Sequence, residues 1–106
     1  MSMGATVVTY TVDAANADKL CQAIADHLVP AARTAPGYKG FLTLDQGEGK
    51  RLGVVLFASV EEAKAAQSII GPVAGRHLYP LMASPSVGAL GTAIVADGLF
   101  VTAATP

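Results

Sequence analysis

Apolar residues recur along the first part of the chain with two different periods, and each period predicts one element. Residues Ala5 to Val12 alternate valine and threonine, a pattern typical of a β-strand. Leu20, Ile24 and Leu28 follow at intervals of four residues, which places them on one face of a helix. The first third of the chain is therefore expected to fold as a strand followed by an amphipathic helix.

Polar and helix-breaking residues mark the expected ends of this helix. Asn16 or Asp18 is expected to cap its start, because short polar side chains accept hydrogen bonds from the free backbone amides there. Pro30 lacks an amide hydrogen and is expected to kink the helix or to end it near residues 32–35. The Pro36–Gly37 pair then stops it.

The middle of the chain predicts a β-hairpin. Two apolar-rich stretches, Tyr38 to Asp45 and Arg51 to Ala58, are expected to form its strands. The polar, glycine-rich segment 46–50 between them is typical of a short hairpin loop.

A second helix and a fourth strand are expected after the hairpin. Ser59 and Glu62 have the spacing of a capping box, in which the serine hydroxyl accepts a hydrogen bond from the amide three residues later. The helix that they open is expected to run to Ile70 and to break at Gly71–Pro72. Residues 89–96 predict the fourth strand.

The order βαββαβ places the chain in the α+β class, with a ferredoxin-like arrangement of an antiparallel four-stranded sheet and helices on one face. A length of 106 residues favours a single domain. Its core is expected to span about residues 5–97, and residues 98–106 are expected to form a C-terminal tail or, from Leu99 to Thr102, a short extra strand.

Both faces of this sheet are expected to be apolar. Alternation along the third strand puts Leu52, Val54 and Leu56 on one face, and Val55 and Phe57 on the other. The helices cover only one face, and a second copy of the chain, packed sheet against sheet, is the simplest cover for the other. A homodimer is therefore expected; the alternative is that the C-terminal hairpin folds over this face.

Composition narrows the function classes. The chain is 52% apolar and 14% charged with a net charge of −1, which excludes a disordered protein and argues against a nucleic-acid or anionic-membrane partner. The N-terminus is typical of a strand rather than a signal peptide, and prolines and glycines interrupt the longest uncharged run, so a cytoplasmic protein outside the membrane is expected.

Cys21 is the single cysteine and is expected to be buried, with nothing cationic beside it. With two histidines and one cysteine far apart, no metal site is expected.

Two short segments have the form of a family signature. The segment 36–40 reads Pro-Gly-aromatic-x-Gly at the start of the second strand, and Phe57 ends the third strand shortly before Ser59 and two glutamates. These segments resemble the antibiotic-biosynthesis monooxygenase superfamily of dimeric α+β barrels, over about residues 5–97. Tryptophan is common in that superfamily where this chain has Phe57.

The resemblance implies a pocket between sheet and helices in each subunit, lined by apolar and aromatic side chains. Cofactor-free oxygenation in this superfamily acts on electron-rich aromatic substrates, which pass an electron to dioxygen once they are deprotonated. The protein then supplies shape, desolvation and a proton acceptor, so no cofactor is expected.

A haem-degrading branch of the same superfamily has stricter requirements. It uses an asparagine in the first strand, a tryptophan in the second helix and an axial histidine just after it. Here residues 7–9 are valines and threonine, the tryptophan position falls near Ala66 or Gln67, and only His77 lies close to its expected place. One residue of three matches.

The segment Arg76-His77-Leu78-Tyr79 is the densest polar and aromatic cluster of the chain. His77 is the first candidate catalytic residue, as base or ligand, because imidazole titrates near neutral pH. Arg76 or Tyr79 would then bind a phenolate or carboxylate. The alternative is that the segment is the solvated face of a helical turn.

Three further residues complete the candidate site. Tyr10, the second catalytic candidate, is expected in the core or the pocket wall, with its hydroxyl seeking a partner. Phe57 would contribute an aromatic wall. His27 is expected at the surface, or as a second candidate base if it turns under the sheet.

The sequence therefore predicts a homodimeric α+β barrel that binds a small apolar or aromatic molecule and acts as a cofactor-independent monooxygenase on electron-rich aromatic or quinol-type substrates. The alternative is a non-catalytic ligand-binding or stress-response protein, which the absence of tryptophan favours. The third and weakest candidate function is haem degradation.

Overall fold

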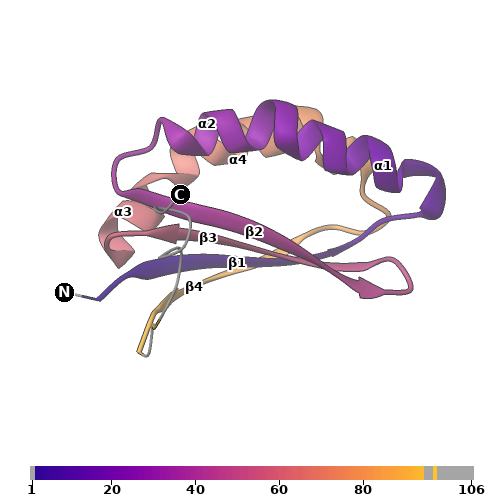
Figure 1. Cartoon of the computed structure of the whole chain (residues 1–106). Coiled ribbons are helices and arrows are strands. Elements are labelled where there is room, and N and C mark those ends of the chain that lie inside the picture. The colour runs from indigo at the N-terminus through magenta and orange to yellow at the C-terminus, as the bar shows by residue number, and fades with distance from the viewer. Residues whose placement is uncertain (1, 95–96, 98–106) are drawn as a thin grey trace, which may run out of the picture.

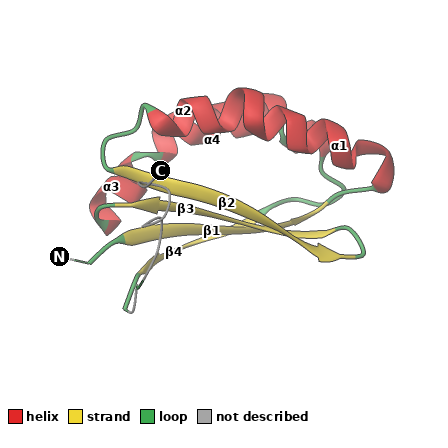
Figure 2. Cartoon of the chain, in the orientation of Figure 1, coloured by secondary structure: helices red, strands yellow, loops and turns green. Residues whose placement is uncertain are grey.

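The computed structural model describes residues 2–94 and 97, and its helices all lie on one face of a single sheet (Figures 1 and 2). The elements follow in the order β1 (Gly4–Thr11), α1 (Ala14–Ala23), the π-helical turn η1 (Ile24–Leu28), α2 (Val29–Arg33), β2 (Tyr38–Gly47), β3 (Lys50–Phe57), α3 (Val60–Ala65), α4 (Gln67–His77), the 3-10 turn η2 (Tyr79–Leu81) and β4 (Val87–Thr92).

The sheet has the order β2-β3-β1-β4, and every neighbouring pair is antiparallel. This arrangement confirms the ferredoxin-like α+β prediction. Within the described ranges, no helix is long and apolar enough to cross a membrane. The predicted fourth strand begins two residues earlier than expected; residues 95–96 of it, and the predicted extra strand at 99–102, lie outside the described residues.

Strand register confirms that both faces of the sheet are apolar. Thr6 of β1 pairs with Val55 of β3, and this row faces the helices. The next row, Val7 with Val54, faces away from them. On the helix side, Leu20 of α1 and Phe57 of β3 are fully buried and form the centre of the core.

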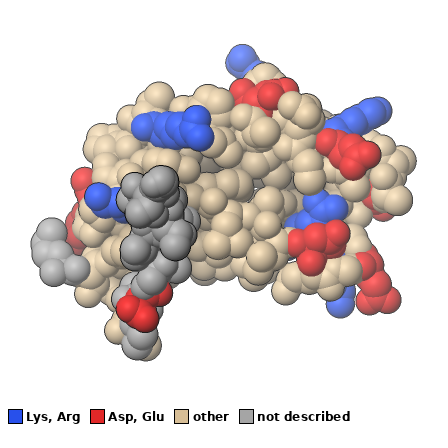
Figure 3. Space-filling model, viewed as in Figure 1, with Lys and Arg blue, Asp and Glu red and all other residues tan. Residues whose placement is uncertain are grey.

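Charged side chains are few, at 14% of the chain. In the view of Figure 3 one group of them lies near the β2–β3 hairpin and the start of α1, others lie over the helices and at the opposite end of the molecule, and the surface between these groups is largely uncharged. The hairpin itself closes through Glu48 and Gly49, which both have positive φ values, 56° and 78°. Two positive φ angles in a two-residue loop match the twist of the strands that it joins.

The first helix starts earlier than expected. Asp13, rather than Asn16 or Asp18, occupies the cap position, and its backbone oxygen accepts a hydrogen bond from the Asn16 amide at 2.9 Å. Pro30 lies in the first turn of α2, and the helix ends at Arg33 with Thr34 as its C-cap, within the expected range of residues 32–35. The wider π-helical turn of η1 lies directly before α2.

The capping box forms, but the predicted break in the following helix does not. Glu62 donates its amide to the Ser59 hydroxyl at 3.1 Å, and that hydroxyl donates to the Glu62 carboxylate at 3.2 Å. The helix is interrupted instead at Ala66, and α4 runs through Gly71 and Pro72. Pro72 is exposed, so water can replace the hydrogen bond that it cannot donate.

The two segments that carry the family resemblance touch each other. Gly37 has a φ of 82°, and a Cβ atom there would collide with the carboxylate of Glu62. The Ala58 amide also donates a hydrogen bond to the Gly37 oxygen at 2.8 Å. Glycine is therefore required at this position, because a side chain would be strained and would displace the capping glutamate.

Candidate functional site

A pocket of about 500 Å³ lies between the sheet and the helices. Its floor comes from the inward-facing positions of the strands, and its roof comes from η1 and α4. The floor includes Thr6, Val8, Tyr10, Phe41, Gly53 and Val55, and the roof includes Ile24, Leu28, Ile70, Gly71, Ala74 and Leu78. Tyr79, Met82, Ser86 and the β4 residues Gly88, Ala89 and Leu90 line its side. This volume falls within the range typical of small-molecule sites.

The polar contact at the pocket wall joins Gln67 of α4 to Thr6 of β1. The Gln67 amide nitrogen donates to the Thr6 hydroxyl at 3.1 Å and to the Ala63 backbone oxygen at 3.2 Å. Thr6 is only 8% exposed. Because both amide hydrogens are used within the described part of the chain, the side-chain oxygen of Gln67 is left as the acceptor that it can offer to a ligand.

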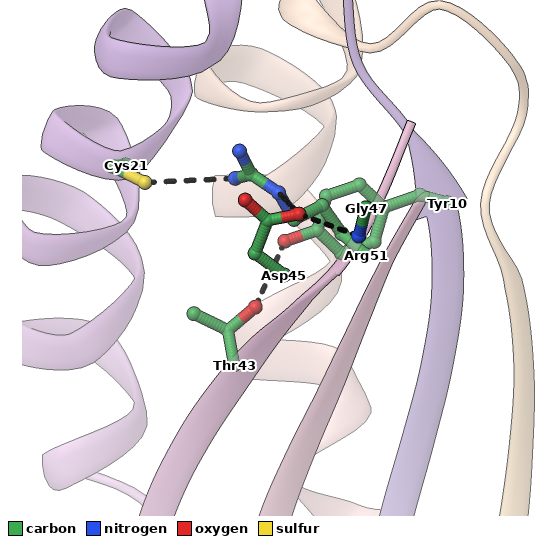
Figure 4. A network of polar contacts seen from close by, with 6 residues as sticks. All are labelled: Tyr10, Cys21, Thr43, Asp45, Gly47 and Arg51. Atoms are coloured by element: carbon green, nitrogen blue, oxygen red, sulfur yellow. Dashed lines mark hydrogen bonds and ion pairs between the residues drawn. The ribbon is translucent and has the colours of Figure 1, made fainter. Parts of the chain in front are cut away.

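Tyr10 lines the pocket and belongs to a second polar network, drawn in Figure 4. Its hydroxyl lies 3.1 Å from the hydroxyl of Thr43 on β2. The next residues along the hairpin, Asp45 and Arg51, approach each other with the Arg51 Nε atom 3.6 Å from the Asp45 carboxylate. Tyr10 is 7% exposed, so its hydroxyl is held by a protein partner rather than by bulk water.

Cys21 corrects an expectation. Its side chain is exposed rather than buried, and a cation lies beside it: the Arg51 guanidinium donates to the sulfur at 3.6 Å (Figure 4). Partial desolvation lowers the pKa of Arg51, but contact with Cys21 and the nearby Asp45 carboxylate raises it more, and the net shift is upward. The sequence gives no sign of this contact, because Cys21 and Arg51 are thirty residues apart.

The predicted site residues divide into two groups. Tyr10 and Tyr79 line the pocket. His77, Arg76 and His27 do not, and Phe57 is fully buried in the core, where its ring meets Tyr38 edge-on at 6.3 Å.

The two histidines instead contact each other. The rings of His27 on η1 and His77 at the end of α4 stack with centroids 3.7 Å apart and an angle of 6°. Partial desolvation, the neighbouring His27 and then Arg76 lower the pKa of His77. The pair therefore links two elements of the pocket roof and favours a neutral His77.

A haem does not fit this arrangement. The residue predicted as its axial ligand, His77, is stacked on His27 and is absent from the pocket lining. Separately, the described ranges contain no group of three His, Cys, Asp or Glu side chains that could hold a metal ion.

Sequence reasoning missed the polar pair Thr6–Gln67. One signal was present: Thr6 alternates with Val8 and Tyr10, so it shares their face of β1. The face of the helix on which Gln67 lies could not be predicted in the same way. The helix is interrupted at Ala66, so the helical period of α3 does not continue into α4.

Comparison with known proteins finds similar solved structures, which identify the fold of the chain. No protein-family model and no curated protein sequence matches the chain. Among solved structures, a protein of unknown function from Nitrosomonas europaea is 18% identical, with a TM-score of 0.76 over 92% of this chain and 94% of that one.

Two characterised proteins are similar to the same degree. SnoaB, a cofactor-independent oxygenase from Streptomyces nogalater, is 18% identical with a TM-score of 0.73, over 91% of this chain and 97% of SnoaB. A Streptomyces coelicolor monooxygenase solved with nanaomycin D is 19% identical with a TM-score of 0.73, over 91% of each chain. The chain therefore has the fold of the antibiotic-biosynthesis monooxygenases, as its two signature segments predict.

Proposed function

We propose that this protein binds a small, largely apolar or aromatic molecule in the pocket and oxidises it as a cofactor-independent monooxygenase. The observation that carries the proposal is the pocket itself, which has largely apolar walls and two separate polar points, Gln67 with Thr6 and the tyrosine Tyr10. Such a site favours a ring system that carries a few oxygen atoms. The fold shared with SnoaB, itself a cofactor-independent oxygenase, supports this function.

The lining limits the chemistry that the protein can supply. Among the residues that the structure describes, the lining contains no histidine, lysine, arginine, aspartate or glutamate, and Tyr10 and Tyr79 are its ionisable groups. An electron-rich substrate of the anthrone type suits such a site, because it provides the electrons itself. Its ring CH₂ loses a proton and reacts with dioxygen to give a hydroperoxide. Loss of water then leaves a carbonyl group, with one oxygen atom in the product and one in water.

Tyr10 is the proposed proton-handling residue, in preference to His77. Tyr10 lines the pocket, and its hydroxyl is oriented by that of Thr43, 3.1 Å away. The Gln67 side-chain oxygen is proposed to accept a hydrogen bond from a substrate hydroxyl. Shielding from water would strengthen both interactions.

Oxygen uptake with 1,8-dihydroxyanthrone tests the proposal. We expect the protein to raise the rate above spontaneous oxidation, and Tyr10→Phe to lower that increase at least tenfold. Tyr38→Phe is the matched control, because this tyrosine packs against Phe57 outside the pocket lining. A rate equal to the spontaneous one, measured with saturating protein, would refute oxygenase activity on this substrate class.

A non-catalytic ligand-binding protein is the second candidate. The described lining residues include no strong base, and this favours a protein that binds its ligand without reaction. It predicts tight binding of the oxidised analogue 1,8-dihydroxyanthraquinone without any oxygen uptake from the anthrone. The two functions therefore separate in the same pair of measurements.

A homodimer is proposed through the face of the sheet that the helices leave open. On this face Leu44 pairs with Leu52 and Leu42 with Val54, and Leu42 and Leu44 are 39% and 48% exposed. Val87 on β4 is 68% exposed. Native mass spectrometry should give about twice the 10.7 kDa chain mass, and Leu44→Glu should shift the protein toward the monomer. A monomeric wild-type protein would refute the dimer.

A further inference from the structure

The floor and roof of the pocket are hollow where glycines replace side chains. Gly53 of β3 and Gly88 of β4 both pair with Val8 of β1, one on each side, and Thr43 of β2 completes the row, so two of its four residues lack a side chain. Val8 and the two glycines line the pocket, and the roof contains Gly71 of α4. The next row, which holds Phe41, Val55, Thr6 and Leu90, carries full side chains.

Backbone conformation does not require glycine at these three positions. None of them has the positive φ seen at Gly37 or Gly49. Glycine inside a strand or a helix weakens that element, because it loses more conformational freedom than other residues on folding. Some other factor must therefore account for glycine here.

Steric crowding does not require it either. A Cβ atom at Gly53 would come no closer than 3.9 Å to the Phe41 ring, and one at Gly88 would lie 3.8 Å from a methyl group of Val8. At Gly71 nothing lies within 4 Å. The fold would accept a small side chain at each position, and that side chain would occupy the pocket.

We propose that Gly53, Gly71 and Gly88 determine ligand size by keeping the pocket wide enough for a fused ring system. This inference rests on the proposed function, because it takes the pocket to be the ligand site. The glycines make no contact with a reacting atom. They act by increasing the cavity volume between the floor and the roof of the pocket.

Binding of two probes of different size tests the inference. The probes are 1,8-dihydroxyanthraquinone, with three fused rings, and hydroquinone, with one ring. Gly53→Val and Gly71→Leu are expected to raise the dissociation constant for the three-ring probe at least tenfold, a change of about 1.4 kcal/mol. They should change the constant for the one-ring probe less than about threefold, since a smaller ligand leaves room for the new side chain.

Gly75→Ala is the control. Gly75 lies one helical turn after Gly71 on α4, is exposed and does not line the pocket, and a Cβ atom there makes only an ordinary contact with the Tyr79 ring at 4.0 Å. Thermal unfolding shows that each variant is folded, and valine in a strand or leucine in a helix should not lower the melting temperature. The Gly75 variant should bind both probes like the wild type.

Different binding results would refute the size-determining role of the glycines and the proposed function of the protein. If the wild type binds neither probe, the proposed function fails. If the wild type binds the three-ring probe and the pocket variants bind it equally well, the size-determining role fails and the proposed function stands. A parallel loss of both probes in the pocket variants would also refute selection by size.

Discussion

Replacing Tyr10 by phenylalanine removes the hydroxyl group of a pocket-lining residue and should lower stability as well as activity. This hydroxyl lies 3.1 Å from that of Thr43, and the Tyr10 side chain is 7% exposed. A hydrogen bond between neutral groups contributes about 0.5–1.5 kcal/mol to the free energy of unfolding. Thr43 is half-buried, so water can reach its hydroxyl once the partner is lost. We therefore expect a loss of about 1 kcal/mol.

Thermal unfolding of a double-mutant cycle measures this contribution. In a domain of this size, 1 kcal/mol corresponds to a fall in melting temperature of roughly 4–8 °C. Tyr10→Phe and Thr43→Val should each show such a fall, and the double variant should lose clearly less than their sum. Tyr38→Phe removes a hydroxyl that has no hydrogen-bond partner among the described residues, and it should leave the melting temperature nearly unchanged.

A coupling energy within about 0.3 kcal/mol of zero would refute this reasoning, because additive effects indicate independent sites. The same variants separate two roles of Tyr10. Thr43→Val keeps the Tyr10 hydroxyl but removes the group that orients it. If oxygen uptake falls in Tyr10→Phe and only partly in Thr43→Val, the hydroxyl takes part directly and Thr43 positions it.

Three further predictions follow from other contacts. Gly4→Ala should lower the free energy of unfolding by about 1–3 kcal/mol, because its Cβ atom would lie 2.5 Å from the backbone oxygen of Ser59; urea unfolding measures this loss. His77 should make stability fall as the pH decreases below about 6.5, since its lowered pKa means that the unfolded chain binds the proton more tightly; unfolding at pH 7.5 and pH 5 shows the change. Gln67→Leu should weaken binding of 1,8-dihydroxyanthraquinone about fivefold to tenfold, as loss of one hydrogen bond costs about 1 kcal/mol.

Each of these predictions has a control. Gly91→Ala places a Cβ atom where none of the described residues lies within 4 Å, and a loss as large as that of Gly4→Ala would contradict the steric explanation. His77→Gln should reduce the dependence of stability on pH; an unchanged dependence would assign it to other groups. Gln67→Glu retains a side-chain oxygen, and binding as weak as in Gln67→Leu would show that this oxygen is not the acceptor.

Sequence patterns predicted the structure correctly where the interacting residues are close in sequence. The Ser59–Glu62 capping box forms as predicted, because both partners lie within one helical turn. Alternation along β3 correctly separates Val54 from Val55, because successive side chains of a strand point to opposite faces. The resemblance to the antibiotic-biosynthesis monooxygenases is confirmed for the fold by the similarity to solved structures of that kind.

Local signals failed where packing could override them. Pro72 was expected to break a helix, but it lies on the exposed side of α4, where the lost hydrogen bond can be replaced by water. The apolar face of this helix is buried against the sheet, and this burial outweighs the local preference of one residue. Pro30 behaves as expected, because α2 ends at Arg33, within the range of residues 32–35.

The sequence by itself determined the order of the elements, the two apolar faces of the sheet and the presence of Tyr10 on the inward face, because these depend on residue periods along one strand or helix. Only the tertiary structure decided which side chains meet across elements. It brings Gln67 to Thr6, Arg51 to Cys21 and His77 to His27, and it leaves His77 outside the pocket. These contacts depend on how α1, η1 and α4 rotate and pack over the sheet, and no period along the chain specifies that rotation.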